Sequence, residues 1–380
     1  MSLHKVVDTI KKLVIGAGIG TVIIIILVVV FRIGAFFIKT INPTPVTPPN
    51  KAHGELSEIS FPESVVDNDF SYILNTISGT LPTDFPDRLV VYPITPREPS
   101  LLNLEKARTK ARSLRFTDSL SNVIAERSLG EGKYEWSDPT GINRKLIFDI
   151  ITFDFTLTSK YLASLTTLSG QRLGDEQNAI KTVENFLNSI GLLHEDIDLE
   201  KTKTPQQNTD YNTYPKLFDI VNGALVPTNS LSNTRVIRVD LFQKDIEYEM
   251  NTGVEEALPI NLSLPIRYPH PPFSTMSFWV ASGQNAAEVG AAEFMHLPID
   301  KSGDLLATYP IITVEQAFSL LESGDAYIAA YQGLEQQILI DSVYLAYYIG
   351  EENQKYLMPI IVFEGQDGFF AYVSAIQKSE

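Results

Sequence analysis

The chain has 380 residues, of which 20% are charged and 44% are hydrophobic, and its formal net charge is −16 at pH 7. The negative charge of such an acidic chain repels the phosphate backbone of a nucleic acid, so we expect no nucleic-acid partner. The chain contains no cysteine, which excludes a disulfide framework, a thiolate metal site and a cysteine nucleophile.

The first predicted element is a transmembrane helix at residues 13–38. Residues 13–31 contain no charged side chain, and as a helix they would span roughly 28 Å, close to the ~30 Å apolar core of a bilayer. A cleaved signal peptide would have a shorter apolar region and a small-residue cleavage site, so we expect an uncleaved anchor. The charged residues that we place at its two membrane edges are Lys11, Lys12, Arg32 and Lys39.

Basic residues are distributed unevenly about this predicted anchor, with three lysines on its amino side and Arg32 and Lys39 at its carboxyl side. This bias favours a cytoplasmic stub at residues 1–12 and an extracytoplasmic C-terminal part, in a single-pass protein of the plasma membrane. Five basic residues and one acidic residue, Asp8, precede residue 51. Residues 51–380 therefore contain 25 basic and 45 acidic residues, a net charge of −20. Gly16 and Gly20 form a Gly-x-x-x-Gly pair, which would permit a homodimer through the helix.

A proline-rich segment follows the predicted anchor. Four prolines lie between Asn42 and Asn50, a composition that favours extended polyproline II. We therefore interpret residues 39–54 as a stalk, and a docking peptide for a proline-recognition domain is the alternative. Residues 55–88 mix short apolar clusters with turn residues, and we interpret them as a connecting segment.

The rest of the chain shows a repeated order of elements. Apolar residues at helical spacing are followed each time by stretches rich in β-branched and aromatic residues, which indicate strands. The predicted helices lie within residues 101–116, 175–193 and 314–324. We therefore expect an α+β fold of about three tandem modules, each a helix with an antiparallel meander, at residues 89–170, 171–300 and 301–380.

Two stretches carry a family resemblance: "YPIITVEQAFSLLESGDAYI", which begins at Tyr309, and "YLMPIIVFEGQDGFFAYVSAI", which begins at Tyr356. A helix followed by long strands and hairpin turns, repeated behind a single membrane anchor, resembles PepSY-like modules. The last module most resembles that of YycI-type membrane-anchored regulators of cell-wall histidine kinases. This resemblance implies regulation of an extracytoplasmic partner and supplies no residue of established chemistry.

The sequence carries few signatures of catalytic or metal-binding sites. The zinc-protease, nucleophile-elbow, phosphate-loop and dinucleotide signatures are absent from the sequence. Glu293 and His296 have the spacing of a helical metal pair, but their surroundings predict a strand, whose alternation puts them on opposite faces. Asp300 opens "DKSGD", which resembles half a calcium loop but is more typical of a turn. We therefore expect no enzyme activity, cofactor or metal.

The resulting hypothesis is a membrane-anchored extracytoplasmic protein that binds and modulates an envelope partner, such as a sensor kinase or peptidase. Alternatives are a structural subunit of a cell-surface or secretion assembly, and an envelope hydrolase. Pro359 lacks an N–H and is typical of an edge strand, so we predict an edge that binds a partner with a basic surface. Its predicted contact residues are Tyr356, Leu357, Pro359, Ile361 and Phe363.

Overall fold

The computed structural model describes residues 49–66, 70–116, 125–203, 214–250, 260–301, 307–350 and 354–377. The chain divides into two compact units. The first comprises Met1–Pro48 and Glu249–Asn261, and the second comprises Pro49–Tyr248 and Leu262–Glu380. Most of the first unit lies outside the described residues.

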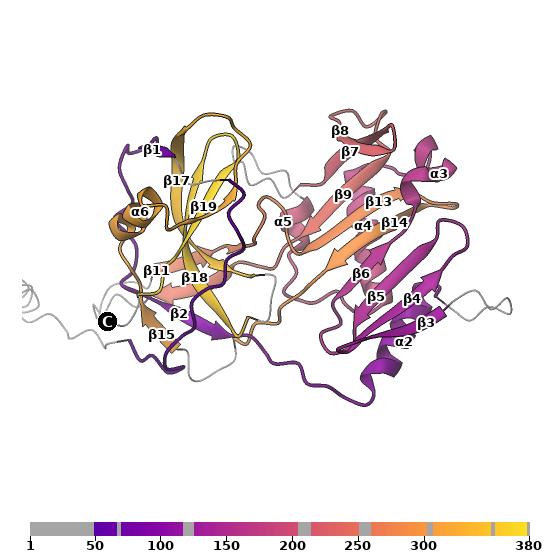
Figure 1. The fold of residues 1–380 in the computed structure, drawn as a ribbon, viewed down its shortest axis with the longest axis horizontal. Coiled ribbons are helices and arrows are strands. Elements are labelled where there is room, and N and C mark those ends of the chain that lie inside the picture. The colour runs from indigo at the N-terminus through magenta and orange to yellow at the C-terminus, as the bar shows by residue number, and fades with distance from the viewer. Residues whose placement is uncertain are drawn as a thin grey trace, which may run out of the picture. The chain divides into compact units, whose positions relative to one another are not determined.

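Nine strands of the second unit form one antiparallel sheet (Figure 1). Each strand pairs with its neighbours through regular registers. The strands, in the order of the sheet, are β3 (Ala125–Gly130), β4 (Lys133–Asp138), β5 (Arg144–Asp149), β6 (Phe155–Thr158), β14 (Ala287–Phe294), β13 (Met276–Ser282), β9 (Val236–Leu241), β7 (Lys216–Val221) and β8 (Ala224–Pro227).

Two helices share one hydrophobic core with this sheet, α2 (Asn103–Ser113) and α4 (Glu176–Ser189). The Asp175 side chain caps α4 by accepting a hydrogen bond from the Asn178 N–H at 2.9 Å. The buried residues of α4 recur at helical spacing, which forms a single apolar face toward the strands: Ala179, Ile180, Val183 and Leu187. Three shorter helical segments flank α4: η1 (Tyr161–Ala163) and α3 (Leu165–Ser169) precede it, and α5 (Leu199–Lys203) follows it.

The second sheet has eight strands. Its main order is β1 (Ser71–Leu74), β17 (Gln337–Tyr348), β18 (Tyr356–Gly365), β19 (Phe369–Ser374) and β16 (Tyr327–Ala330). β12 (Ile266–Arg267) also pairs with β17, while β2 (Arg88–Pro93) pairs with β18 and with β15 (Ala307–Pro310). β1 and β12 run parallel to β17, and the other pairs are antiparallel. β10 (Ile246–Met250) and β11 (Ile260–Leu264) form a separate two-stranded sheet.

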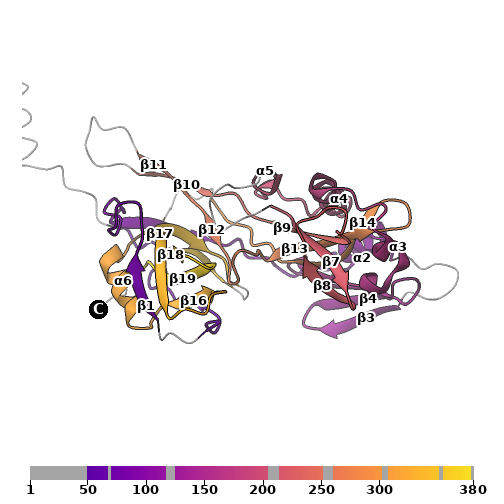
Figure 2. The same ribbon diagram turned by 90° about the horizontal axis from the view of Figure 1, so that it is seen from above.

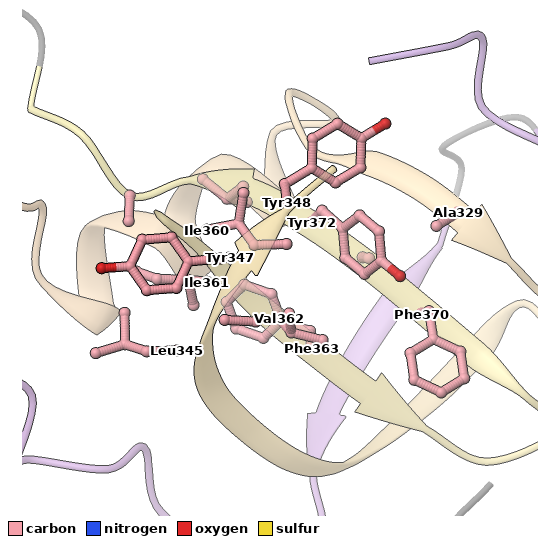
Figure 3. Close-up of a cluster of buried hydrophobic side chains, with 14 of the residues drawn as sticks. Ala329, Leu345, Tyr347, Tyr348, Ile360, Ile361, Val362, Phe363, Phe370 and Tyr372 are labelled. Atoms are coloured by element: carbon pink, nitrogen blue, oxygen red, sulfur yellow. The ribbon is translucent and has the colours of Figure 1, made fainter. Parts of the chain in front are cut away.

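The core of the eight-stranded sheet is aromatic and aliphatic. Figure 3 shows part of it, in which Leu345 of β17 and Phe363 of β18 lie among buried side chains of the neighbouring strands. Helix α6 (Val314–Glu322) packs against this sheet (Figure 2), and its Phe318 ring lies 6.0 Å from that of Phe363. The α6 N-terminus is held by reciprocal hydrogen bonds between Thr313 and Gln316.

The predicted fold class is wrong. The described residues form mainly strands in three sheets, and they do not fold as tandem helix-plus-meander modules. Pairing of β6 with β14 joins strands from two predicted modules into one sheet. The eight-stranded sheet likewise takes β1 from the predicted connecting segment and β12 from the predicted second module. Local hydrophobic patterns identify strands, but they do not determine which distant strands pair.

The membrane prediction is also corrected. No helix in the described part of the chain is long and apolar enough to cross a bilayer. The structure thus gives no support to a single-pass plasma-membrane localisation or to the transmembrane part of the predicted fold. The anchor at residues 13–38 and its stub at 1–12 lie outside the described residues, as do Lys11, Lys12, Gly16, Gly20, Arg32 and Lys39.

Candidate functional site

One side of strand β17 is only partly paired. β18 lies along its other side. On the first side, β1 pairs with residues 337–340 and β12 pairs with residues 347–348. No described strand pairs with residues 341–346 on this side. The described strands therefore leave a stretch of this edge open between two short parallel strands, and we call this stretch the β17 slot.

Backbone hydrogen bonds mark both ends of the β17 slot. The Asn75 N–H donates to the Ile340 carbonyl oxygen at 2.8 Å, and the Tyr347 N–H donates to the Pro265 carbonyl oxygen at 2.9 Å. Alternate residues of a strand direct their peptide groups to the same side. Val343 and Leu345 therefore direct their N–H and C=O groups into the slot, as Tyr347 does at its end.

A groove of about 860 Å³ lies over this stretch of edge. One wall comes from the segment that follows β1 and includes Phe85, and another comes from residues 262–267, which include Leu264. Residues of β17 and β18 form the remaining lining. The unpaired peptide groups thus lie in a depression with apolar walls.

The two faces of β17 differ in polarity at the slot. Val343 and Leu345 are 9% and 5% exposed and belong to the hydrophobic core. Ser342 and Tyr344 alternate with them and therefore point to the opposite face. Glu364 of β18 lies directly across from Ser342 and adds a carboxylate to that face. A strand placed in the slot would meet an apolar face and a polar face.

A chain of hydrogen bonds organises the polar face. The Arg267 Nε donates to the Tyr344 hydroxyl at 3.0 Å, and that hydroxyl donates to Oε2 of Glu364 at 2.9 Å. Burial raises the pKa of Tyr344, so the phenol stays a neutral donor between the two charged groups. The guanidinium also lies 5.2 Å from the Tyr344 ring centroid. These contacts hold the positive charge of Arg267 against the groove wall.

The rim of the groove carries a negative charge. Asp84 and Asp341 are exposed at the groove, and the Asn75 side-chain amide donates to Oδ1 of Asp341 at 2.6 Å. Among the described residues, no lysine or arginine forms an ion pair with either aspartate. With Glu364 and Arg267, the groove holds three carboxylates and one guanidinium.

The predicted contact strand is not an edge. β18 pairs with β17 on one side and with β19 on the other, and its first two residues pair with β2. The prediction of an open edge is therefore wrong for the five residues named, which are Tyr356, Leu357, Pro359, Ile361 and Phe363. All but Tyr356 are buried. The unpaired edge belongs instead to the neighbouring strand β17.

Pro359 is tolerated inside the sheet because its missing N–H is replaced. Its carbonyl oxygen accepts a hydrogen bond from the Ala375 N–H at 3.1 Å. A non-proline residue at position 359 would also donate its own N–H to the Ala375 carbonyl oxygen. The Ile312 N–H, at 2.8 Å from that oxygen, donates the hydrogen bond instead. No acceptor is left unsatisfied, so this proline does not require an edge position.

The histidines form a separate polar cluster. Nε2 of His296 lies 2.8 Å from Oδ1 of Asp196, and the Arg97 guanidinium donates to the His296 carbonyl oxygen at 2.8 Å. The Gln243 side-chain amide also donates to Asp196 at 2.8 Å. Burial raises the pKa of Asp196, but the hydrogen bonds from His296 and Gln243 and the two nearby histidines together outweigh it, and the net pKa is lowered. Burial and the neighbouring His296 lower the pKa of His194 to about 4.

The described residues of this histidine cluster do not reach the number of ligands that a metal centre needs. In the described part of the chain, no group of three or more histidine, aspartate or glutamate side chains could hold a metal. Glu293 is exposed whereas His296 is buried, so the i, i+3 pair does not converge. Arg97 and Asp196 were not singled out in the sequence, because the contacts that join them to His296 span about 100 residues or more.

No family model matches the chain, and no curated protein matches it. Among solved structures, the chain is similar to an uncharacterised protein from Eubacterium rectale, with 9% identity and a TM-score of 0.30, covering 77% of this chain and 87% of that one. It is also similar to the Bacillus megaterium YpeB C-terminal domain, with 10% identity and a TM-score of 0.28, covering 74% and 95%.

Neither similarity supports the YycI-type resemblance. At TM-scores this low, neither similarity carries an argument about fold or function. The PepSY-like interpretation therefore remains a hypothesis.

Proposed function

We propose that the protein is a binding protein that modulates a partner protein by accepting an extended segment of that partner in the β17 slot. The observation that carries this proposal is the stretch at residues 341–346, which lacks a described neighbouring strand on one side and lies under a groove. Unpaired N–H and C=O groups at a sheet edge can be completed by a strand from another chain.

The energetics favour a partner strand over water at this position. A backbone hydrogen bond contributes about 0.5–1.5 kcal/mol net, and Val343 and Leu345 together offer two donors and two acceptors. Apolar surface of a bound segment that is buried against the groove walls near Phe85 and Leu264 contributes about 25 cal/mol per Å² to the binding free energy. Because β17 is already fixed by β18, the slot needs little reordering before it binds.

The test is photocrosslinking in cells from a photoreactive residue at Ser342, which is exposed at the slot. We expect an adduct with one partner protein, mapped to one extended segment of that partner. The same probe at Gln171, an exposed residue outside the groove lining, should give none.

The matched variants are Val343→Pro and Val343→Ala. Proline removes an N–H that points into the slot without removing a bond to β18, whereas alanine keeps that N–H. We expect the Ser342 adduct to be lost in the proline variant and kept in the alanine variant, with both proteins folded by circular dichroism. An adduct of equal yield in the folded proline variant would contradict the proposal.

A further inference from the structure

We infer that the segment accepted by the β17 slot alternates apolar and basic residues, and this inference rests on the proposed function. The chemistry of its occupant follows from three features of the groove: the length of the open edge, the apolar side chains at its mouth, and the acidic side chains at its rim.

The length of the slot limits the paired part of the occupant. Six residues, 341–346, lie between the part of β17 that pairs with β1 and the part that pairs with β12. At ~3.3 Å per residue they span about 20 Å. The pairing of β17 with β18 shifts register between Ile340 and Ser342, so the regular part of the edge begins after this irregularity. Val343 and Leu345 supply its inward-directed peptide groups, so the occupant pairs over about four residues.

Apolar side chains at the groove remain available for contact. Ile77 is fully exposed at the groove, and Phe85 and Leu262, which also line it, are half-buried. An isolated exposed apolar residue needs no explanation, but three that line one groove beside an open strand edge form a surface that apolar side chains of an added strand would cover. Alternation in that strand places its apolar residues on one face.

The charge of the groove favours basic residues on the other face. Glu364 is already linked to Arg267 through the Tyr344 hydroxyl. Among the described residues, no lysine or arginine lies within ion-pair distance of Asp84 or Asp341, so both carboxylates offer an ion-pair partner to a basic side chain of the occupant. An acidic occupant would be repelled by them, whereas a lysine or arginine would be attracted.

The test measures binding of fluorescent hexapeptides to the full chain by anisotropy. One peptide alternates valine and lysine, a second alternates valine and glutamate, and a third is the valine–lysine peptide with an N-methyl group on every backbone amide. We expect the valine–lysine peptide to bind at least tenfold more tightly than the valine–glutamate peptide, and its affinity to fall as salt is raised. N-methylation should abolish binding, because it removes the backbone donors.

The double variant Asp84→Asn with Asp341→Asn should remove most of the preference for lysine, while binding stays sensitive to Val343→Pro. Equal binding of the lysine and glutamate peptides, lost in Val343→Pro, would overturn this inference and leave the proposed function standing. Failure of all peptides, or binding that Val343→Pro leaves unchanged, would overturn the proposed function. A lysine preference that persists in the double aspartate variant would show that Asp84 and Asp341 are not its source and would also overturn the inference.

Discussion

The imidazole rings of His194 and His296 stack with their centroids 4.1 Å apart and their planes inclined by 9°. Asp196 lies 2.8 Å from Nε2 of His296, whereas the Arg97 guanidinium lies 3.5 Å from Nδ1. Two charged side chains thus contact the two ring nitrogens of His296, while its ring face packs against His194. Burial and the adjacent His296 ring both disfavour a proton on His194.

Acid should therefore destabilise the fold through His194. Its pKa is lowered from 6.5 to about 4 in the folded chain. The unfolded chain thus binds a proton that the folded chain does not, and stability is lost as pH falls from about 6.5 toward 4. The lowered pKa of Asp196 adds a loss at still lower pH, whereas the raised pKa of Asp154 acts in the opposite direction. The midpoint of urea-induced unfolding, measured at pH 7, 5 and 4, reports the sum of these three contributions.

The contribution of His194 is isolated by substitution. His194→Gln should reduce the fall in midpoint between pH 7 and pH 4, because glutamine does not take up a proton. His270→Gln, which removes an exposed histidine outside the cluster, should keep the wild-type fall. Identical pH profiles for the two variants would refute the role of the stacked pair.

Gly365 should not tolerate a side chain. A Cβ at this position would lie 2.4 Å from the Leu339 carbonyl oxygen, which is backbone and cannot move aside cheaply. We expect Gly365→Ala to lower the free energy of unfolding by about 1–3 kcal/mol. At Gly350 the nearest atom is a Tyr348 side-chain carbon at 3.3 Å, so Gly350→Ala should cost less. Denaturation of the two variants side by side checks this order.

The N-terminus of α6 should depend on Thr313. Its hydroxyl accepts a hydrogen bond from the Gln316 N–H at 3.2 Å, and the Gln316 side chain accepts one from the Thr313 N–H at 2.9 Å. Thr313→Ala should lower stability by about 1 kcal/mol. Ser319→Ala, an exposed change on the same helix, should stay within about 0.5 kcal/mol. A melting temperature unchanged in the Thr313 variant would show that the cap contributes nothing.

The sequence was informative about local elements. Residues 175–193 and 314–324, where apolar residues recur at helical spacing, contain α4 and α6 in the structure. The apolar stretch "YLMPIIVF", which predicts a strand, lies in β18. These elements follow from apolar periodicity and capping residues, which act over a few residues along the chain.

The sheet topology and the site were not predictable in the same way. β1 pairs with β17 across more than 260 residues, and β12 reaches the same strand from a different segment. The sequence of β17 does not mark which of its sides is covered. Pro359 pointed to the wrong strand because its missing hydrogen bond is supplied by Ile312, a residue distant in the sequence. Such compensation depends on tertiary structure.

The most direct test of the β17 slot is residue-resolved hydrogen exchange in the free protein. The amides of Val343 and Leu345 point into the slot, whereas the Tyr347 amide donates to Pro265 at 2.9 Å. We predict that Val343 and Leu345 exchange at least a hundredfold faster than Tyr347 and than the interior residue Ile361, because unpaired edge amides need no opening of the sheet. Exchange of Val343 and Leu345 as slow as that of Tyr347 would mean that this edge is already paired, and it would contradict the account.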